Sequence, residues 1–213
     1  MAPTIADTRG GSDAHAASAS TRARIGPNAI VRVAEALVDR VGTDAAATLF
    51  ARAGLSRHVA HPPTEMVEEA DVARLQWQLR ADLDADLARE VAWDAGTRTG
   101  DYLLAHRIPA PAQWVLRHLP PFLAARVLTR AIAKHAWTFA GSGTFHCTPG
   151  NPFILTITHS PLCSRIRASA PVCHYYSATF ERIFRTLVSD RARVIEVDCE
   201  AAGGAACVFE VAW

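Results

Sequence analysis

The spacing of apolar residues changes once along this 213-residue chain, at about residue 139, and this change constrains the fold more than any other feature. Before it, apolar residues recur at helical spacing in segments separated by Gly or Pro. After it, the runs FILTITH, RVIEVDC and CVFEVAW have the character of strands, and they bracket one helical segment at 175–189. Helices followed by strand pairs predict an α+β fold with an antiparallel sheet of about four strands.

The same pattern defines the domain organisation. Residues 1–24 contain a single large aliphatic side chain, Ile5, so we expect a disordered tail that cannot bury enough surface to order itself. Residues 25–213 are expected to form one domain, with a mainly helical half at 25–138 and an α+β half at 139–213. The predicted helices lie at about 27–41, 44–53, 69–82, 84–106, within 108–121, and at 121–137 and 175–189.

Composition excludes several classes of protein. Half of the residues are apolar and the net charge is +1, so no global field predicts binding to nucleic acid. Five cysteines and no visible secretion signal favour reduced thiols in the cytoplasm. No run of about 18 uncharged apolar residues predicts a transmembrane helix.

Strand register at the C-terminus brings two cysteines together. Both terminal strands must turn their apolar faces to the same core, because a slip of one residue turns a strand inside out. The residues expected to point inward are Ile195, Val197, Cys199, Cys207, Phe209, Val211 and Trp213. Glu196, Asp198 and Glu210 are then expected to face solvent. Cys199 should lie across from Cys207, through a loop with an odd number of residues and a glycine bulge.

Three stretches carry a family resemblance: DYLLAHRIPAPAQWVLRHLPPFLAARVLTRAIAKHAWTFAGSGTF, VCHYYSATFERIFRTLV and EVDCEAAGGAACVFEV. They resemble the bacteriochlorophyll 4-vinyl reductase family over about residues 25–213. The C-terminal part is similar to the wider 4-vinyl-reductase ligand-binding domain, where a Cys opens the last helix and a Cys–Gly–Cys–Phe hairpin ends the chain. The matching residues here are Cys173, Cys199, Gly203 or Gly204, Cys207 and Phe209.

The resemblance implies a fold similar to the TRAPP-complex core subunits, which dimerise around an apolar ligand channel, and a place in bacteriochlorophyll synthesis. The family name implies reduction of the 8-vinyl group (4-vinyl in the older numbering) of divinyl protochlorophyllide or chlorophyllide. That reaction needs a redox cofactor. The GSG at 141–143 lacks the third glycine of a dinucleotide fingerprint, and CxxC is absent.

These observations favour a homodimeric protein that carries or presents a (magnesium) tetrapyrrole intermediate to enzymes of the pathway. The alternatives are the 8-vinyl reductase itself and a regulatory scaffold for magnesium chelatase or a neighbouring enzyme. A position at the periphery of the photosynthetic membrane is left open.

Aromatic, imidazole and basic side chains concentrate in 114–139, as a flat macrocycle with propionate groups requires. The candidate tetrapyrrole-binding residues are Trp114, His118, Phe122, Arg126, Arg130, His135, Trp137 and Phe139. Arg126, Arg130 and Lys134 share one helix face and could receive propionates, and an imidazole could ligate the central magnesium. The alternative interpretation is core aromatics beside a solvated helix face.

Cys173, Cys199 and Cys207, with Cys163 or His174 as the fourth ligand, could hold a tetrahedral zinc ion. Their spacing is not a recognised zinc signature, and buried free thiols are the alternative.

Tyr102, His106 and Arg107, close together near a predicted helix end, are acid–base candidates. The alternative for this group is an aromatic core residue beside a helix C-terminus.

Overall fold

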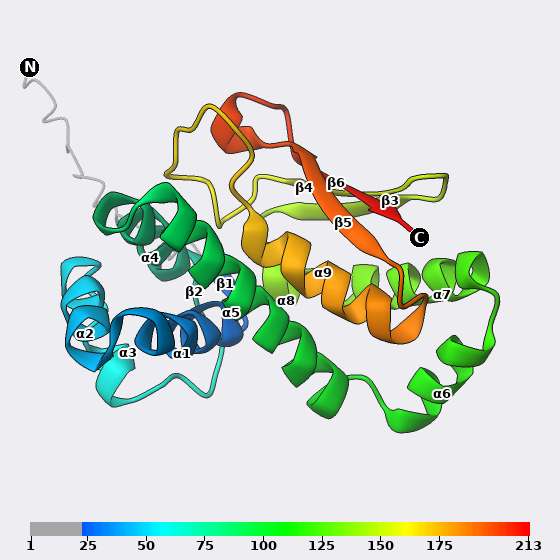
Figure 1. Ribbon diagram of the computed structural model, residues 1–213, viewed down its shortest axis with the longest axis horizontal. Helices are drawn as coiled ribbons and strands as arrows, with labels where there is room; N and C mark the ends of the chain where they lie inside the picture. Colours follow the sequence, from blue (N-terminus) through cyan, green and yellow to red (C-terminus); the bar gives the residue numbers. More distant parts are fainter. Residues whose placement is uncertain (1–22) are drawn as a thin grey trace, which may run out of the picture.

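The computed structural model describes residues 23–213 as a helical half beside a four-stranded sheet (Figure 1). The helices are α1 (Asn28–Val41), α2 (Thr43–Arg52), α3 (Arg57–Ala60), α4 (Glu69–Asp82), α5 (Ala85–His106), α6 (Ala110–His118), α7 (Pro121–Lys134), α8 (Trp137–Ala140) and α9 (His174–Leu187). The strands are β1 (Arg24–Ile25), β2 (Val67–Glu68), β3 (Thr144–Thr148), β4 (Phe153–Thr158), β5 (Arg193–Asp198) and β6 (Cys207–Ala212). The tail expected at 1–24 lies outside the described residues except at its end, where Arg24 already pairs in β1.

The long helices agree with the apolar spacing, and the α+β class is confirmed. The helix expected over 121–137 is the exception, because α7 ends at Lys134 and the strand expected from residue 139 begins only at Thr144. Apolar spacing continues through this stretch and gives no sign of the break. A turn at Gly141, whose φ is 58°, and a close backbone contact at Gly143 redirect the chain here.

The main sheet is antiparallel throughout, with strand order β3-β4-β6-β5. Alternate residues of β4 and β6 are buried, as a sheet with one covered face requires. Helix α9 lies along this sheet, and its buried side also packs against α5 (Figure 1). The inward residues of the two central strands are Phe153, Leu155, Ile157, Cys207, Phe209 and Val211.

The predicted orientation of β5 is wrong. Val194 and Glu196 are buried, whereas Ile195 is 63% exposed and Val197 is 47% exposed. A bulge between Glu196 and Asp198 interrupts the pairing with β6. The expected bulge in the hairpin loop is therefore displaced into the strand itself. Sequence alternation alone assigned the carboxylate to solvent because buried carboxylates are rare without a partner. Trp213, also expected inside, is 38% exposed.

Two glycines allow α5 and α9 to pack closely. A Cβ at Gly96 would lie 2.2 Å from the carbonyl oxygen of Tyr175, and one at Gly100 would lie 2.7 Å from the side chain of Arg182. The helices are also joined by a hydrogen bond from Thr179 Oγ1 to the Gly96 carbonyl at 3.0 Å. This contact connects the helical half to the sheet, because α9 belongs to the α+β half.

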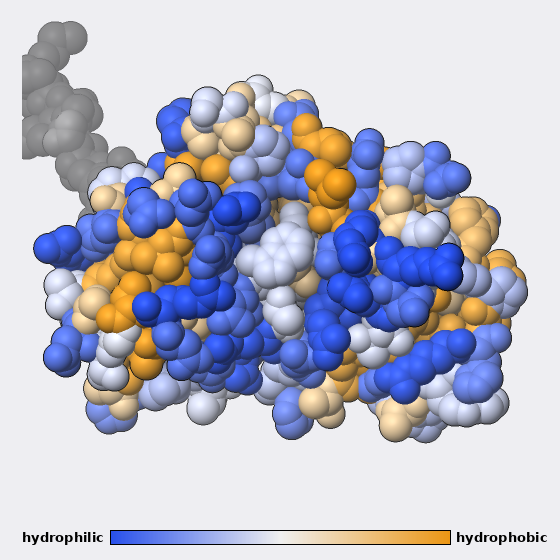
Figure 2. All heavy atoms as spheres, viewed as in Figure 1, coloured by the Kyte–Doolittle hydropathy of each residue, from blue (hydrophilic) through white to orange (hydrophobic). Residues whose placement is uncertain are grey.

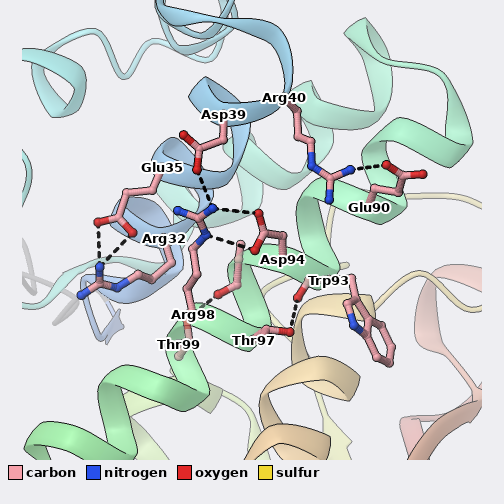
Figure 3. A network of polar contacts seen from close by, with 11 residues as sticks. Arg32, Glu35, Asp39, Arg40, Glu90, Trp93, Asp94, Thr97, Arg98 and Thr99 are labelled. Carbon is pink, nitrogen blue, oxygen red and sulfur yellow. Dashed lines mark hydrogen bonds and ion pairs between the residues drawn. The ribbon is translucent and has the colours of Figure 1, made fainter.

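Helix α1 is held on the other side of α5 by ion pairs (Figure 3). Arg98 of α5 pairs with Asp39 of α1 at 2.5 Å and with Asp94 of its own helix at 3.0 Å. Arg40 of α1 also pairs with Glu90 of α5. These groups are largely exposed, so they orient the two helices and contribute modestly to stability.

We expect Gly96→Ala to lower the free energy of unfolding by about 1–3 kcal/mol, because the added methyl group collides with α9. Helix propensity alone would give the opposite sign, about 0.5–1 kcal/mol of stabilisation. Urea denaturation followed by circular dichroism measures the difference. The reverse exchange at the exposed Ala105 of the same helix, Ala105→Gly, is the control and should cost only the propensity term. A more stable Gly96→Ala protein would show that α5 and α9 are not in close contact.

Candidate metal centre and ligand cleft

Four cysteine thiols converge in the interior beside the end of the sheet. Cys163 follows β4, Cys173 immediately precedes α9, Cys199 follows β5 and Cys207 opens β6. All four side chains are buried, and their sulfur atoms lie within 4.8 Å of one another. Of the two fourth ligands considered from sequence, the structure brings Cys163 to the other thiols. His174 is not in this group.

The distances suit a tetrahedral ion. The Cys207 sulfur lies 3.5 Å from those of Cys163 and Cys173 and 3.8 Å from that of Cys199, and the Cys173 and Cys199 sulfurs are 3.9 Å apart. Four thiolates around zinc with Zn–S bonds of about 2.3 Å are separated by about 3.8 Å in a regular tetrahedron. The spacing is that of a single bound ion, since an iron–sulfur cluster places iron and sulfide atoms between its cysteines.

Electrostatics point to a cation at the same place. Contacts with Cys163 and Cys199 raise the pKa of Cys207, whereas contacts with Cys163 and the other two thiols lower the pKa of Cys199, so the group does not ionise evenly by itself. A metal ion removes this conflict because it stabilises all of its thiolate ligands. The guanidinium of Arg80 is close enough to feel the charge of three of these thiols, and it donates to the Val172 carbonyl.

Glu196 adds an oxygen to the surroundings of the thiols. One carboxylate oxygen accepts the Cys173 amide at 2.6 Å, while its Oε1 is buried with no hydrogen-bond partner among residues 23–213. Burial, followed by the charge of Cys199, raises the pKa of this carboxyl to about 8. The unpartnered oxygen is a further sign that the site is built for a cation.

The thiol cluster fixes an irregular loop, residues 159–173, that connects β4 to α9. Backbone amides of His159 and Ser160 donate to the Glu200 carboxylate at 2.5 and 2.8 Å. In the middle of the loop, the Ala168 amide donates to the Ala201 carbonyl at 2.9 Å. Two of the four thiols belong to this loop, so a bound metal ion would connect it to the sheet through coordinate bonds.

Two adjoining pockets lie beside this loop, each with a volume of about 430 Å³, and Arg165 lines both. Other residues that line the first pocket are Glu69, Ser142, His159, Cys163, Arg167 and Glu200. The second pocket is lined further by Arg52, Ala53, Arg74, Trp77 and Gln78. We refer to the two pockets together as the Arg165 cleft.

The Arg165 cleft is suited to a flat anion. Neither Arg165 nor Arg167 pairs with a carboxylate within the described residues, so their guanidinium groups are available. Both acidic residues of the cleft are already engaged, because Glu69 accepts the Ser142 amide and hydroxyl, each at 2.8 Å, and Glu200 accepts loop amides. Trp77 is 49% exposed at the rim and offers a surface for stacking.

The tetrapyrrole-binding residues predicted from sequence lie mostly on an open surface. Trp114 and His118 of α6 are exposed and their rings are 4.3 Å apart. Phe122 of α7 is 43% exposed, with the guanidinium of Arg126 over its ring at 5.6 Å. Arg130, Lys134, His135 and Trp137 are also exposed.

Phe139 differs from the other predicted residues because it belongs to the interior. Its ring contacts those of Phe145, Tyr176 and Phe180 at centroid distances of 5.5–6.1 Å. It therefore packs in the aromatic core beneath α9.

The acid–base candidates are also placed. Tyr102 and His106 have ring centroids 4.7 Å apart, and the guanidinium groups of Arg32 and Arg107 lie over the Tyr102 ring. This arrangement is a stack that connects α1 to the end of α5.

Comparison with known proteins identifies the family. Residues 153–212, which contain all four clustered thiols, match the model of the 4-vinyl-reductase domain. The "Bacteriochlorophyll synthase 23 kDa chain" of Cereibacter sphaeroides is 44% identical over 188 residues, covering 88% of this chain and 90% of that protein. The chain belongs to this family. The 23 kDa chain of Rhodobacter capsulatus is 39% identical over 186 residues, covering 87% and 85% of the two chains. The predicted family membership and the place in bacteriochlorophyll synthesis are thereby confirmed.

The fold resembles that of a protein with a very different sequence. A mutant of the H-NOX protein from K. algicida, in its Fe(II) unliganded form, superimposes with a TM-score of 0.59 at 10% identity, covering 88% of this chain and 96% of that one. The likeness concerns the fold alone. The similarity to TRAPP subunits stays a prediction. None of the described helices has the length and apolar character that crossing a bilayer requires.

The Arg165 cleft could not be found from sequence, because α2, α4 and the 159–173 loop meet only in the folded chain. The fourth thiol had a partial signal, since Cys163 is one of two cysteines within eleven residues.

We expect the purified protein to bind one Zn²⁺ per chain and Cys199→Ser to weaken binding by roughly 100-fold or more. Structural zinc sites bind with about 10–16 kcal/mol shared among four ligands. Metal analysis after dialysis and competition with a chromogenic chelator measure this. Cys147→Ser is the matched control, because Cys147 lies on β3 outside the cluster. Equal losses in both variants would contradict a four-thiol site.

Proposed function

We propose that this protein binds an anionic tetrapyrrole intermediate of bacteriochlorophyll synthesis and presents it to enzymes of the pathway. The observation that carries the proposal is the Arg165 cleft, where unpaired arginines and a half-exposed tryptophan face the same space. Propionate groups of a macrocycle suit forked guanidinium donors, and its plane suits an indole ring. Membership in a bacteriochlorophyll synthase subunit family supplies the chemical class of the ligand.

The metal centre supports the proposal by its position. Cys163 lines the cleft and is separated by a single residue from Arg165. A metal ion on Cys163 and Cys173 would hold the loop that carries both unpaired arginines. A binding site held in place before the ligand arrives loses less entropy on association.

The aromatic face of α6 and α7 is the second candidate surface for the pigment. Trp114, His118 and Phe122 lie beside the basic row of α7 there, as the sequence predicted. An open face would release its ligand readily, as a carrier must, but it buries less of a macrocycle than a cleft does. Variants can separate the two surfaces because they share no residue.

We expect magnesium protoporphyrin and divinyl protochlorophyllide to bind with a shift of the Soret band and to persist when NADPH is added. Arg165→Gln combined with Trp77→Ala should weaken binding by roughly tenfold to a hundredfold, since each lost charge-assisted or stacking contact costs about 1–2 kcal/mol. Absorption titration of the purified protein measures both effects. Arg191→Gln, at an exposed arginine in the turn between α9 and β5, is the control.

Other outcomes identify the rival functions. If Trp114→Ala with His118→Ala abolishes the shift and the cleft variant does not, the pigment binds on α6 and α7. Loss of the vinyl group with NADPH would indicate the 8-vinyl reductase. The absence of any pigment binding, together with salt-sensitive association with magnesium chelatase, would indicate a scaffold. Light scattering tests the predicted homodimer separately.

A further inference from the structure

Charge is strongly segregated along the chain. Between Asp101 and Glu181 the sequence has no acidic residue, yet it has seven Arg or Lys residues. The net charge of the whole chain is only +1, so the remaining residues carry an excess of acid. The acid-free stretch includes all of α6, α7 and α8. A surface helix of a protein that faces only water normally mixes both signs of charge.

Large apolar side chains are exposed on the same helices. Six of the eleven exposed large hydrophobic residues described for this chain fall between residues 114 and 137. They are Trp114, Val115, Phe122, Leu123, Val127 and Trp137. At the lower right of Figure 2, over α6 and α7, hydrophobic and strongly hydrophilic residues lie side by side. We call the exposed side of α6, α7 and Trp137 the α6–α7 face.

The helices hold this arrangement outward. On α7 the buried residues Ala124, Ala125 and Leu128 face the core, so Leu123 and Val127 share the outer side with the basic row. Helix α6 buries Leu116 alone among its own residues. It is held instead by polar bonds, from Gln113 to the Leu104 and Ile108 carbonyls and from Arg117 to the Thr186 carbonyl. Trp114 and Val115 therefore project away from the protein.

We propose that the α6–α7 face docks on the surface of a bilayer that contains anionic lipids. Tryptophan, phenylalanine and leucine insert at the boundary between headgroups and acyl chains, and arginine and lysine beside them contact anionic headgroups. A second copy of this chain fits poorly, because two acid-free cationic faces would repel each other. The proposal goes beyond tetrapyrrole binding and does not depend on it.

The test uses the full-length protein without pigment. Co-sedimentation with equimolar phosphatidylglycerol and phosphatidylcholine vesicles should show binding that weakens with added salt, and pure phosphatidylcholine vesicles should bind much less. Replacing Arg126, Arg130 and Lys134 by Gln should lower the partition coefficient by roughly tenfold to a hundredfold. Replacing Arg40, Arg89 and Arg193 by Gln changes the net charge equally on other elements and should have little effect.

Apolar insertion has its own readout. Lipids brominated in the acyl chain should quench tryptophan fluorescence of the wild-type protein, and Trp114→Phe with Trp137→Phe should remove most of that quenching. This measurement needs no charge variant, so it stands even if the triple replacement fails to fold by circular dichroism. No binding to anionic vesicles, equal loss in both charge variants, or unchanged quenching in the double variant would overturn the proposal. A dimer in solution that Trp114→Ala dissociates would overturn it in favour of self-association.

Discussion

The meeting of four thiols is the contact on which the C-terminal half depends. It joins the loop after β4, the start of α9, the end of β5 and the start of β6, four points that regular hydrogen bonding does not connect directly. Sulfur atoms 3.5–3.9 Å apart are close for separate thiols, and a shared cation makes that closeness favourable. Arg80 lies nearby with the opposite charge to the thiolates, so the neighbourhood is organised around one ionic centre.

The helical half and the sheet half meet through α5 and α9, and the two candidate binding surfaces are distributed around that seam. The Arg165 cleft lies beside α2, α4 and the 159–173 loop, whereas α6 and α7 lie at the other end of the molecule (Figure 1). A ligand in the cleft and a surface beneath α6 and α7 would therefore not compete for space. The two proposals are geometrically compatible, and each can be true without the other.

Sequence predicted the long helices, the antiparallel sheet and three of the clustered thiols, because apolar periodicity reports which face of an element is buried. It did not predict two-residue strands such as β1 or the single turn α8, since elements this short contain no period. It misplaced Glu196 because a carboxylate is assigned to solvent unless its partners are known, and those partners, the Cys173 amide and the thiols, are distant in sequence. The cleft has the same origin, since Trp77 and Arg165 are brought together only by folding.

The bulge in β5 has a consequence for how this domain can vary. Glu196 and Cys199 are separated by three positions, an odd number, and an unbroken pleat would send their side chains to opposite faces. The irregularity between Glu196 and Asp198 lets both reach the interior. An insertion or deletion of one residue here would therefore move either the carboxylate or the thiol out to solvent, so the length of this short segment is more restricted than most of its side chains.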